Sequence, residues 1–190
     1  EEEMRIRFET RHLWERSFAD PRAFIDLYFR EKYRKERNEV IVRDGRVVSA
    51  LQKLPYPMTD GGRMLPASYI SGACTDENYR RRGLMGELLK QALRAESGKM
   101  KDESCCHPGG HSPLSAFSFL IPATADLATY YAKFGYTPCF RFGWKTVTAG
   151  TTDGSLAVDT VDQHRTEELL PYLRDKMQER TMCVQHPLSD

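Results

Sequence analysis

The chain has 190 residues, of which 40% are hydrophobic, and its 28 Lys and Arg residues nearly balance its 27 Asp and Glu residues. A chain with this balance has neither the large positive net charge of many nucleic-acid-binding proteins nor the acidic composition of a disordered tail. The apolar runs stay well below the roughly 18 residues that a membrane span needs. We therefore expect one globular domain with some additional chain, and neither a nucleic-acid partner nor a membrane partner.

Two further features indicate the cellular compartment. The acidic start EEEMRIRF lacks the apolar stretch of a secretory signal. The five cysteines form no disulfide pattern. The expected localisation is therefore the cytoplasm, where thiols remain reduced.

The first part of the chain predicts helices followed by antiparallel strands. Residues 9–36 carry apolar side chains at helical spacing, interrupted at Asp20 and Pro21, which predicts two short helices. Asp44 and Gly45 suit a two-residue hairpin turn between β-branched runs. The strands predicted around this turn and after a later Gly-Gly turn are residues 38–43, 46–56 and 63–75.

The rest of the chain alternates between predicted helices and strands. Residues 80–95 place leucines along one helical face, and Gly135 stands where a helix C-cap belongs. Pro171 is expected to kink or interrupt the last helix. The remaining elements are strands at 117–121 and 140–148 and helices at 125–134 and 165–180. This order predicts an α/β fold of the α+β type.

Residues 97–116 are rich in Ser, Gly and Pro and have no periodicity, which predicts a long loop. The segment also holds Cys105, Cys106, His107 and His111, whose side chains are zinc ligands in many proteins. Adjacent cysteines do not match the usual spacing of zinc ligands. We therefore expect a loop and no metal, with a zinc site as the alternative.

Three consecutive arginines precede a glycine where the helix predicted at 80–95 begins. The first N–H groups of a helix have no partner inside the helix, and the helix dipole favours an anion there. Gly83 and Gly86 lack a Cβ atom, so that a phosphate can approach the main chain, and guanidinium groups suit phosphate. The turn is therefore interpreted as a pyrophosphate site. The alternative is a solvated basic cap, although arginines at a helix start oppose the dipole.

The pattern Y-R-x-R-G-x-x-G-x-L-L after a predicted strand resembles the pyrophosphate-binding turn of the GCN5-related N-acetyltransferases (GNAT family). The family motif Q/R-x-x-G-x-G/A falls on Arg80, Gly83 and Met85, where Met85 replaces Gly or Ala, and Gly86 follows one residue later. Three arginines followed by Gly-Leu-Met are similar to the branch of the enhanced-intracellular-survival (Eis-like) acetyltransferases.

A second segment, ATYYAKFGYTP at residues 128–138, resembles the family's tyrosine-containing helix and the Gly-Tyr pair that follows it. The resemblance implies a mixed, mostly antiparallel sheet that is splayed between its central strands and flanked by helices, with acetyl-CoA in the opening. We expect this domain at residues 1–148. We expect a C-terminal extension at 149–190, which in one interpretation begins a second domain.

The resemblance also implies which residues bind acetyl-CoA as co-substrate. The main chain of one strand pairs with the pantetheine arm as an added strand would, and the turn before the helix holds the pyrophosphate. A free N–H on that strand also suits the thioester oxygen. The implied residues are Ala73, Cys74 and Thr75 on the strand and Arg80, Arg81, Arg82, Gly83, Leu84, Met85 and Gly86 at the turn.

Tyr131 aligns with the tyrosine that acts as general acid in many family members. A phenol with a pKa near 10 stays protonated at neutral pH and can give its proton to a leaving thiolate. The alternative is a core aromatic side chain packed by Tyr130 and Phe134. The two adjacent tyrosines point about 100° apart around a helix, so both cannot face the thiol.

Cys74 raises the alternative of a covalent acetyl-cysteine route, which needs a partner base or a lowered pKa. No such partner is visible, so we expect Cys74, Cys139 and Cys183 to be small buried thiols. The sequence does not identify a general base for the amine. The candidates for this role are His12, His164, His186 and several Glu residues, and none stands at a spacing that demands it.

The predicted function is acetyl transfer from acetyl-CoA to a primary amine by direct attack. The acceptor is a small molecule or a lysine-type amine, and a homo-oligomer is a further expectation. The alternative function is a non-catalytic CoA-binding regulatory or scaffold module. An ATP site is disfavoured, because a P-loop needs G-x₄-G-K-S/T and this pattern is absent.

Overall fold

The structure is a computed structural model that describes residues 1–97, 117–140, 163–180 and 183–184. The helices are α1 (Glu2–Ser17), α2 (Arg22–Glu31), α3 (Leu84–Ser97), α4 (Ala125–Ala132) and α5 (Gln163–Gln178), with 3-10 turns η1 (Lys35–Arg37) and η2 (Glu77–Tyr79). The strands are β1 (Asn38–Arg43), β2 (Arg46–Pro55), β3 (Met58–Asp60), β4 (Arg63–Leu65), β5 (Ala67–Thr75), β6 (Phe117–Phe119) and β7 (Cys183–Val184).

The predicted break at Asp20 and Pro21 separates α1 from α2. The N–H groups at the start of a helix make no hydrogen bond inside the helix. Proline has no N–H and therefore loses nothing at such a position, so Pro21 is well placed directly before α2. The indole N–H of Trp14 donates a 2.8 Å hydrogen bond to the Asp20 carboxylate, which ties this connection to α1. α1 begins at Glu2, earlier than the predicted start at residue 9.

Both predicted turns join antiparallel strands. Asp44 and Gly45 have φ angles of 50° and 75°, as the type I′ turn between β1 and β2 requires. The glycine pair between β3 and β4 has φ angles of 54° and 77°. The single strand predicted at 63–75 is wrong, because Pro66 divides it into β4 and β5. Proline cannot donate to a strand ladder, so it stands between the two strands.

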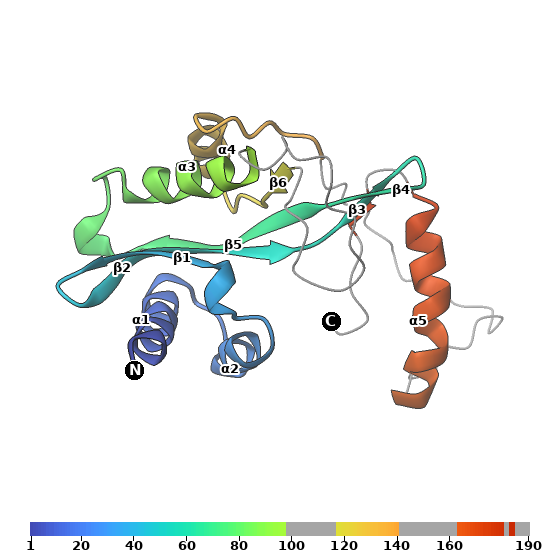
Figure 1. Cartoon of the computed structure of the whole chain (residues 1–190), viewed down its shortest axis with the longest axis horizontal. Helices are drawn as coiled ribbons and strands as arrows, with labels where there is room; N and C mark the ends of the chain where they lie inside the picture. Colours follow the sequence, from blue (N-terminus) through green and yellow to red (C-terminus); the bar gives the residue numbers. More distant parts are fainter. Residues whose placement is uncertain (98–116, 141–162, 181–182, 185–190) are drawn as a thin grey trace, which may run out of the picture.

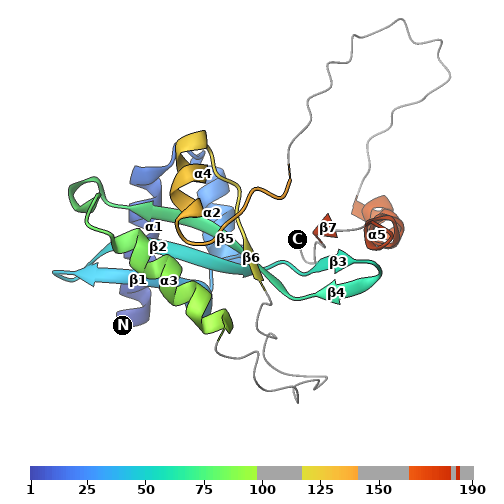
Figure 2. The ribbon, with the colours of Figure 1, turned by 90° about the horizontal axis from the view of Figure 1, so that it is seen from above.

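One four-stranded sheet, in the order β1-β2-β5-β6, forms the centre of the molecule. α1 and α2 cover one face of this sheet, and α3 and α4 cover the other (Figures 1 and 2). All neighbours are antiparallel except β5 and β6, which confirms the predicted mixed, mostly antiparallel sheet flanked by helices. The core on the α3 side consists of Ile41, Val48, Leu51, Ile70, Leu88, Leu89 and Ala92. The two clusters on the α1–α2 side consist of Leu13, Trp14, Ile25, Tyr28, Phe29, Tyr33, Val47, Ala50, Leu54 and Cys74.

The parallel pairing of β5 and β6 is short. It begins with Ala67 opposite Phe117 and ends with Tyr69 opposite Phe119. Residues 70–75 of β5 continue past this point and have no partner strand on that edge within the described ranges. The sheet therefore opens between two of its strands, as a splayed sheet does.

The C-terminal elements contact the β3–β4 hairpin. β7 pairs with β3, with Cys183 opposite Thr59, and the Thr59 hydroxyl donates a 3.0 Å hydrogen bond to the Arg180 carbonyl after α5. Pro171 lies inside α5, which continues through it. The predicted domain boundary at residue 148 lies outside the described residues.

Two further expectations also fall outside the described residues. They are the loop predicted at 97–116, apart from Ser97 at the end of α3, and the strand predicted at 140–148, apart from Phe140. The alternative zinc site belongs to the first of these segments. Its candidate ligands are Cys105, Cys106, His107 and His111.

Candidate active site

β5 contains a bulge opposite β2. Ala50 pairs with Cys74 and Gln52 pairs with Ser71, so one residue of β2 lies opposite two residues of β5. Gly72 has a φ of +60°, the left-handed conformation that a glycine bulge uses. The extra residue of a bulge stays outside the strand ladder. The middle of β5 therefore has a backbone amide that β2 does not engage.

β5 and β6 separate directly after their last pair, Tyr69 and Phe119. The ring centroids of these two residues are 5.3 Å apart, and Tyr69 packs against the cluster formed by α1, α2 and β2. Beyond this pair, residues 70–75 present a backbone edge that runs toward the turn before α3. This edge includes residues 73–75, which the sequence predicts to contact pantetheine.

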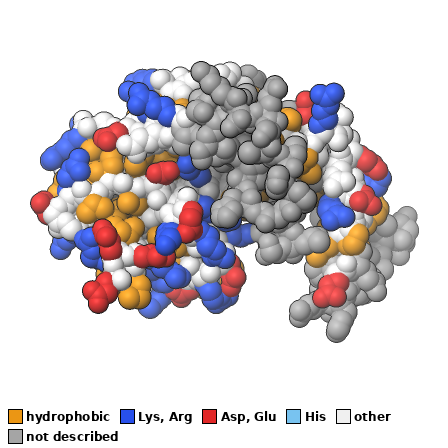
Figure 3. Space-filling view, viewed as in Figure 1, with side chains coloured by type: hydrophobic (Ala, Val, Ile, Leu, Met, Phe, Trp, Pro, Cys, Tyr) orange, Lys and Arg blue, Asp and Glu red, His pale blue; other side chains and the backbone are white. Residues whose placement is uncertain are grey.

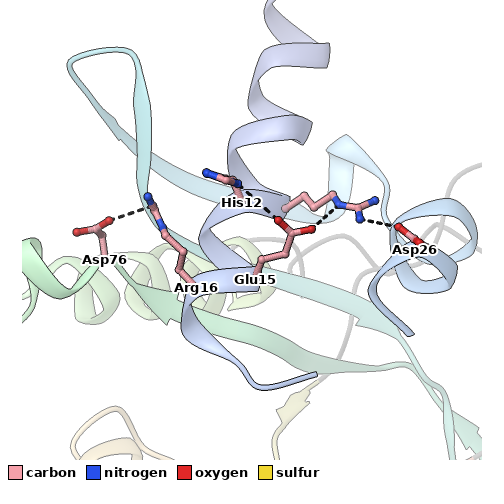
Figure 4. A network of polar contacts seen from close by, with 6 residues as sticks. His12, Glu15, Arg16, Asp26 and Asp76 are labelled. Atoms are coloured by element: carbon pink, nitrogen blue, oxygen red, sulfur yellow. Dashed lines mark hydrogen bonds and ion pairs between the residues drawn. The ribbon is translucent and has the colours of Figure 1, made fainter. Parts of the chain in front are cut away.

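Asp76 organises the turn between β5 and α3. Its N–H donates a 2.9 Å hydrogen bond to the Val48 carbonyl, and its carboxylate accepts a 3.0 Å hydrogen bond from the N–H of Asn78. The same carboxylate pairs with the Arg16 guanidinium at 3.0 Å (Figure 4). Asp76 therefore caps η2 and connects the turn to the end of α1.

The three arginines predicted to bind phosphate differ in their contacts and backbone conformation in this turn. The Nε of Arg80 donates a 3.1 Å hydrogen bond to the Thr75 carbonyl at the end of β5. The Arg82 guanidinium lies over the Tyr79 ring, 5.0 Å from its centroid. Arg81 has a φ of +62°, a conformation that costs a non-glycine residue roughly 1 kcal/mol or more. All three are exposed, and basic side chains are prominent at this end of the molecule (Figure 3).

The start of α3 leaves backbone donors available next to these arginines. The first helical hydrogen bond runs from the N–H of Glu87 to the Gly83 carbonyl at 3.0 Å. The N–H groups of Leu84, Met85 and Gly86 come before this bond and have no partner inside the helix. Gly83 has a φ of +79°, and a Cβ atom there would meet nothing within 4 Å. Consecutive amides around such a glycine form a concave site that suits an anion.

The helix predicted at residues 80–95 begins at Leu84, after the three arginines and not at the first of them.

Gly86 and Met85 have packing roles at the start of α3. A Cβ atom at Gly86 would lie 2.9 Å from the Cζ of Phe134, so contact with the segment after α4 explains the absence of a side chain there. Met85 replaces the Gly or Ala of the family motif, and its side chain packs against the core cluster on the α3 side. The residue that departs from the motif is thus accommodated by the core.

Tyr130 and Tyr131 leave α4 in different directions. The Tyr130 hydroxyl lies 3.8 Å from the Cβ position of Gly86, at the start of α3. The Tyr131 ring lies edge-on to Tyr136, with centroids 6.0 Å apart, and Tyr131 interacts electrostatically with Tyr69 on β5. Of the two adjacent tyrosines, Tyr131 is therefore the one that interacts with Tyr69, the last residue of β5 paired with β6.

The surroundings of Tyr131 keep its phenol protonated. Burial is the main cause that raises the pKa of Tyr131 above its ordinary value of 10, and the neighbouring phenols of Tyr130, Tyr136 and Tyr69 raise it further. Tyr136 shares a 2.8 Å hydrogen bond with the Ser118 hydroxyl on β6, which positions the Tyr136 ring beside Tyr131. Tyr131 can therefore act as a proton donor at neutral and mildly alkaline pH.

Cys74 is a buried thiol, as expected. Burial raises its pKa from 9 to about 12, which keeps it from forming the thiolate that a covalent route requires. It packs on the α1 side of the sheet with Leu13 and Val47. Cys139 differs from the expectation, because it is exposed in the irregular segment after α4, where its Sγ donates to the Thr137 carbonyl.

No histidine is placed at the opening within the described residues. His12 stacks on Phe8, its Nδ1 lies 3.5 Å from the Glu15 carboxylate, and it occupies the exposed side of α1 (Figure 4). His164 belongs to α5, and His186 lies outside the described residues. Of the three candidates, the structure therefore describes the side chain of His12 alone, and that side chain does not lie at the opening.

Three features of this site were not predicted from the sequence. The bulge residue Gly72 was visible only as a glycine inside a predicted strand, which is a known bulge signal. Asp76 precedes a polar turn, as capping residues do. The long-range partners of these two residues, Trp14 against Gly72 and Arg16 against Asp76, had no local signal in the sequence.

The described ranges contain neither a membrane-spanning helix nor a cluster of metal ligands. None of the helices in them is both long and apolar enough to cross a membrane. In the same part of the chain, no three His, Cys, Asp or Glu side chains gather in a way that could hold a metal ion.

Comparison with solved structures finds the same fold. AAC(6')-Iy in complex with a bisubstrate analog, CoA-S-monomethyl-acetylneamine, is 12% identical, with a TM-score of 0.54 over 75% of this chain and 92% of that one. An acetyltransferase from Trypanosoma brucei is 16% identical, with a TM-score of 0.50 over 77% of this chain and 95% of that one. A GCN5-related N-acetyltransferase from Kribbella flavida is 23% identical, with a TM-score of 0.43. That match covers 48% of this chain and 25% of the Kribbella protein, so the chain spans only part of the length of this relative.

The family assignment rests on the sequence match. No curated protein matches the chain significantly. Residues 8–108 match the family described as the acetyltransferase (GNAT) domain, and this match covers more than half of the chain. The chain therefore belongs to the GNAT acetyltransferase domain family.

Proposed function

We propose that this chain transfers an acetyl group from acetyl-CoA to a primary amine by direct attack, with Tyr131 as general acid. The observation that carries the proposal is the opening between β5 and β6. Its free edge, residues 70–75, begins directly after Tyr69, with which Tyr131 interacts, and ends at the turn before α3 that we propose to bind the pyrophosphate. The triple arginine of this turn supports a place in the Eis-like branch.

The residues around the opening fit the parts of acetyl-CoA. Pantetheine carries amides, so it can pair with the free edge of β5 as an added strand. The pyrophosphate would accept hydrogen bonds from the N–H groups at the start of α3 and from the arginines of the turn. The residues proposed for these contacts are Ala73, Cys74, Thr75, Arg80, Arg81, Arg82, Gly83, Leu84, Met85 and Gly86.

The proposed reaction balances without a further reactant. Acetyl-CoA supplies the activated acetyl group. The C–N bond to the amine forms and the C–S bond of the thioester breaks. The nitrogen loses one proton and the leaving sulfur gains one, so the number of protons is unchanged. The unengaged amide of the Gly72 bulge would donate to the thioester oxygen as negative charge develops on it. Tyr131 would protonate the leaving sulfur and recover its proton through solvent.

Two measurements test this proposal. Calorimetric titration with acetyl-CoA measures binding, and a thiol reagent measures CoA release with a panel of primary amines. We expect binding, together with CoA release that matches the amount of acetylated amine found by mass spectrometry. Binding without turnover across a broad panel would favour the CoA-binding module, and failure to bind CoA would reject both functions.

A further inference from the structure

A cavity of about 300 Å³ lies at the end of the sheet where the β1–β2 hairpin turns and β5 ends. We call it the hairpin cavity, and its lining comes from the hairpin, from the end of α1 and from η2. The hairpin turn and the turn that leads to α3 lie at the same end of the molecule in both views (Figures 1 and 2). This volume is at the lower end of the range for ligand sites, so the cavity suits a small molecule.

Two arginines of the lining stand against each other. Arg43 and Arg46 flank the hairpin turn and are directly opposite in the pairing of β1 with β2. The Arg43 guanidinium donates a 2.9 Å hydrogen bond to the uncharged Val42 carbonyl. Within the described residues, neither guanidinium forms an ion pair with a carboxylate. Like charges directly opposite each other destabilise a strand pair, and an anion between them would offset this repulsion.

The carboxylates of the lining leave the cavity with an excess of positive charge. One Asp76 oxygen pairs with the Arg16 guanidinium at 3.0 Å (Figure 4), and the other accepts a 3.0 Å hydrogen bond from the N–H of Asn78. Asp76 is therefore already engaged. Asp44 in the hairpin turn is the second carboxylate of the lining. It leaves one negative charge beside the two guanidinium groups of Arg43 and Arg46, which favours an anionic ligand.

The chemistry of the lining suits a phosphate group in particular. A guanidinium presents a planar fork of N–H donors that matches two oxygens of a phosphate. Asn78 and Tyr79, which also line the cavity, carry an amide and a hydroxyl group that can donate further hydrogen bonds. The buried residues Val47 and Val48 belong to the lining as well, so the cavity reaches the core. Hydrogen bonds to a charged group are stronger beside such a low-dielectric interior than in open water.

We propose that the hairpin cavity binds the phosphate group of a phosphate monoester between Arg43 and Arg46. The cavity adjoins the turn proposed for the pyrophosphate, because Tyr79 lines the cavity and Arg80 follows it directly. Two sources can supply such a phosphate. One is CoA itself, whose ribose carries a 3′-phosphate, and the other is a separate phosphorylated ligand. The site does not require acetyl transfer, so the inference goes beyond the proposed function.

Calorimetric titration with inorganic phosphate at constant ionic strength tests the site. We expect Arg46→Gln to weaken phosphate binding at least about tenfold, because it removes a charge-assisted hydrogen bond. Arg63→Gln, at an exposed arginine of β4, is the matched control and should bind phosphate as the unchanged protein does. Equal phosphate affinities in Arg46→Gln and Arg63→Gln would overturn the proposal, as would an unchanged protein that binds no phosphate.

Two further measurements locate the phosphate and check the fold. Gly83→Val, which would block the turn before α3, should leave phosphate affinity nearly unchanged. Loss of phosphate binding in Gly83→Val but not in Arg46→Gln would assign the phosphate to that turn and overturn the proposal. Without phosphate, Arg46→Gln should resist chemical denaturation at least as well as the unchanged protein, since it relieves a like-charge pair. Retained stability shows that its weaker binding does not come from altered folding.

Titrations with CoA and 3′-dephospho-CoA distinguish the two sources. If the 3′-phosphate of CoA occupies the cavity, Arg46→Gln weakens CoA binding at least about tenfold and leaves 3′-dephospho-CoA binding unchanged. If a separate ligand occupies it, inorganic phosphate binds equally to the free and the CoA-saturated protein. Either result supports the hairpin cavity as a phosphate site. Phosphate binding that depends on Arg46 in a protein that binds no CoA would preserve this site and reject the proposed function.

Discussion

Trp14 lies directly against Gly72. A Cβ atom on Gly72 would be 2.2 Å from the Cζ3 of Trp14, so the indole occupies the space that any side chain would need. Gly72 also has a φ of +60°, which L-residues with side chains rarely adopt. The helix α1 therefore holds in place the bulge of β5, whose amide we propose to contact the thioester oxygen.

The first prediction concerns this contact. Gly72→Ala should lower the free energy of unfolding by about 2–4 kcal/mol, from the strained φ together with the overlap with Trp14. Chemical denaturation measures the change. Gly61→Ala is the control, because Gly61 also has a positive φ, of +54°, but has nothing within 4 Å of its Cβ position. It should cost only about 1 kcal/mol. Equal losses in the two variants would show that the Trp14 contact does not constrain the bulge.

The second prediction concerns the turn before α3. Gly83→Val should weaken CoA binding about tenfold or more, because the side chain would fill the space next to the free amides and because phosphate contacts would be lost. Calorimetry with CoA measures the affinity. Gly62→Val is a close control, since Gly62 has a φ of +77° against +79° for Gly83 and nothing lies within 4 Å of either Cβ position. Both variants carry similar backbone strain, so normal CoA affinity in Gly83→Val would remove this turn from the site.

The third prediction concerns the proton donor. Tyr131→Phe should lower kcat about 100-fold or more while leaving CoA affinity nearly unchanged, because it removes a proton transfer and little binding surface. Tyr130→Phe is the control, because it removes a hydroxyl from the adjacent residue, which faces the start of α3. Steady-state kinetics and CoA titration are measured on both variants. Equal losses of turnover and affinity in Tyr131→Phe would count against the role of general acid.

The fourth prediction concerns the two thiols that the structure describes. Cys74 has its pKa raised from 9 to about 12, so its thiol form dominates until the pH approaches 12. Iodoacetamide reacts with the thiolate, so the native protein at about pH 8 should leave Cys74 unmodified and modify the exposed Cys139. Peptide mass spectrometry reads the result. Rapid alkylation of Cys74 in the folded protein would reopen the acetyl-cysteine route.

Local sequence signals predicted most of the elements. Asp44 and Gly45 predicted the first hairpin because a two-residue turn with positive φ at both positions favours this pair. Pro21 predicted the break between α1 and α2 for an equally local reason. The prediction of one strand at 63–75 failed at Pro66. The residues on both sides of Pro66 have a composition typical of strands, but proline cannot donate a hydrogen bond to the strand ladder. The sequence-based prediction also placed the arginines inside a helix that begins only at Leu84.

By itself, the sequence determined the order of the elements and identified the family, because turn residues, helical periodicity and the Arg-Gly and Tyr motifs are all local patterns. Tertiary structure alone decided which edge of β5 stays free, that Trp14 holds the bulge, that Arg16 joins Asp76, and that Tyr131 interacts with Tyr69. These relationships join residues far apart in the chain. No spacing along the sequence encodes such contacts, since they arise only when the helices pack on the two faces of the sheet.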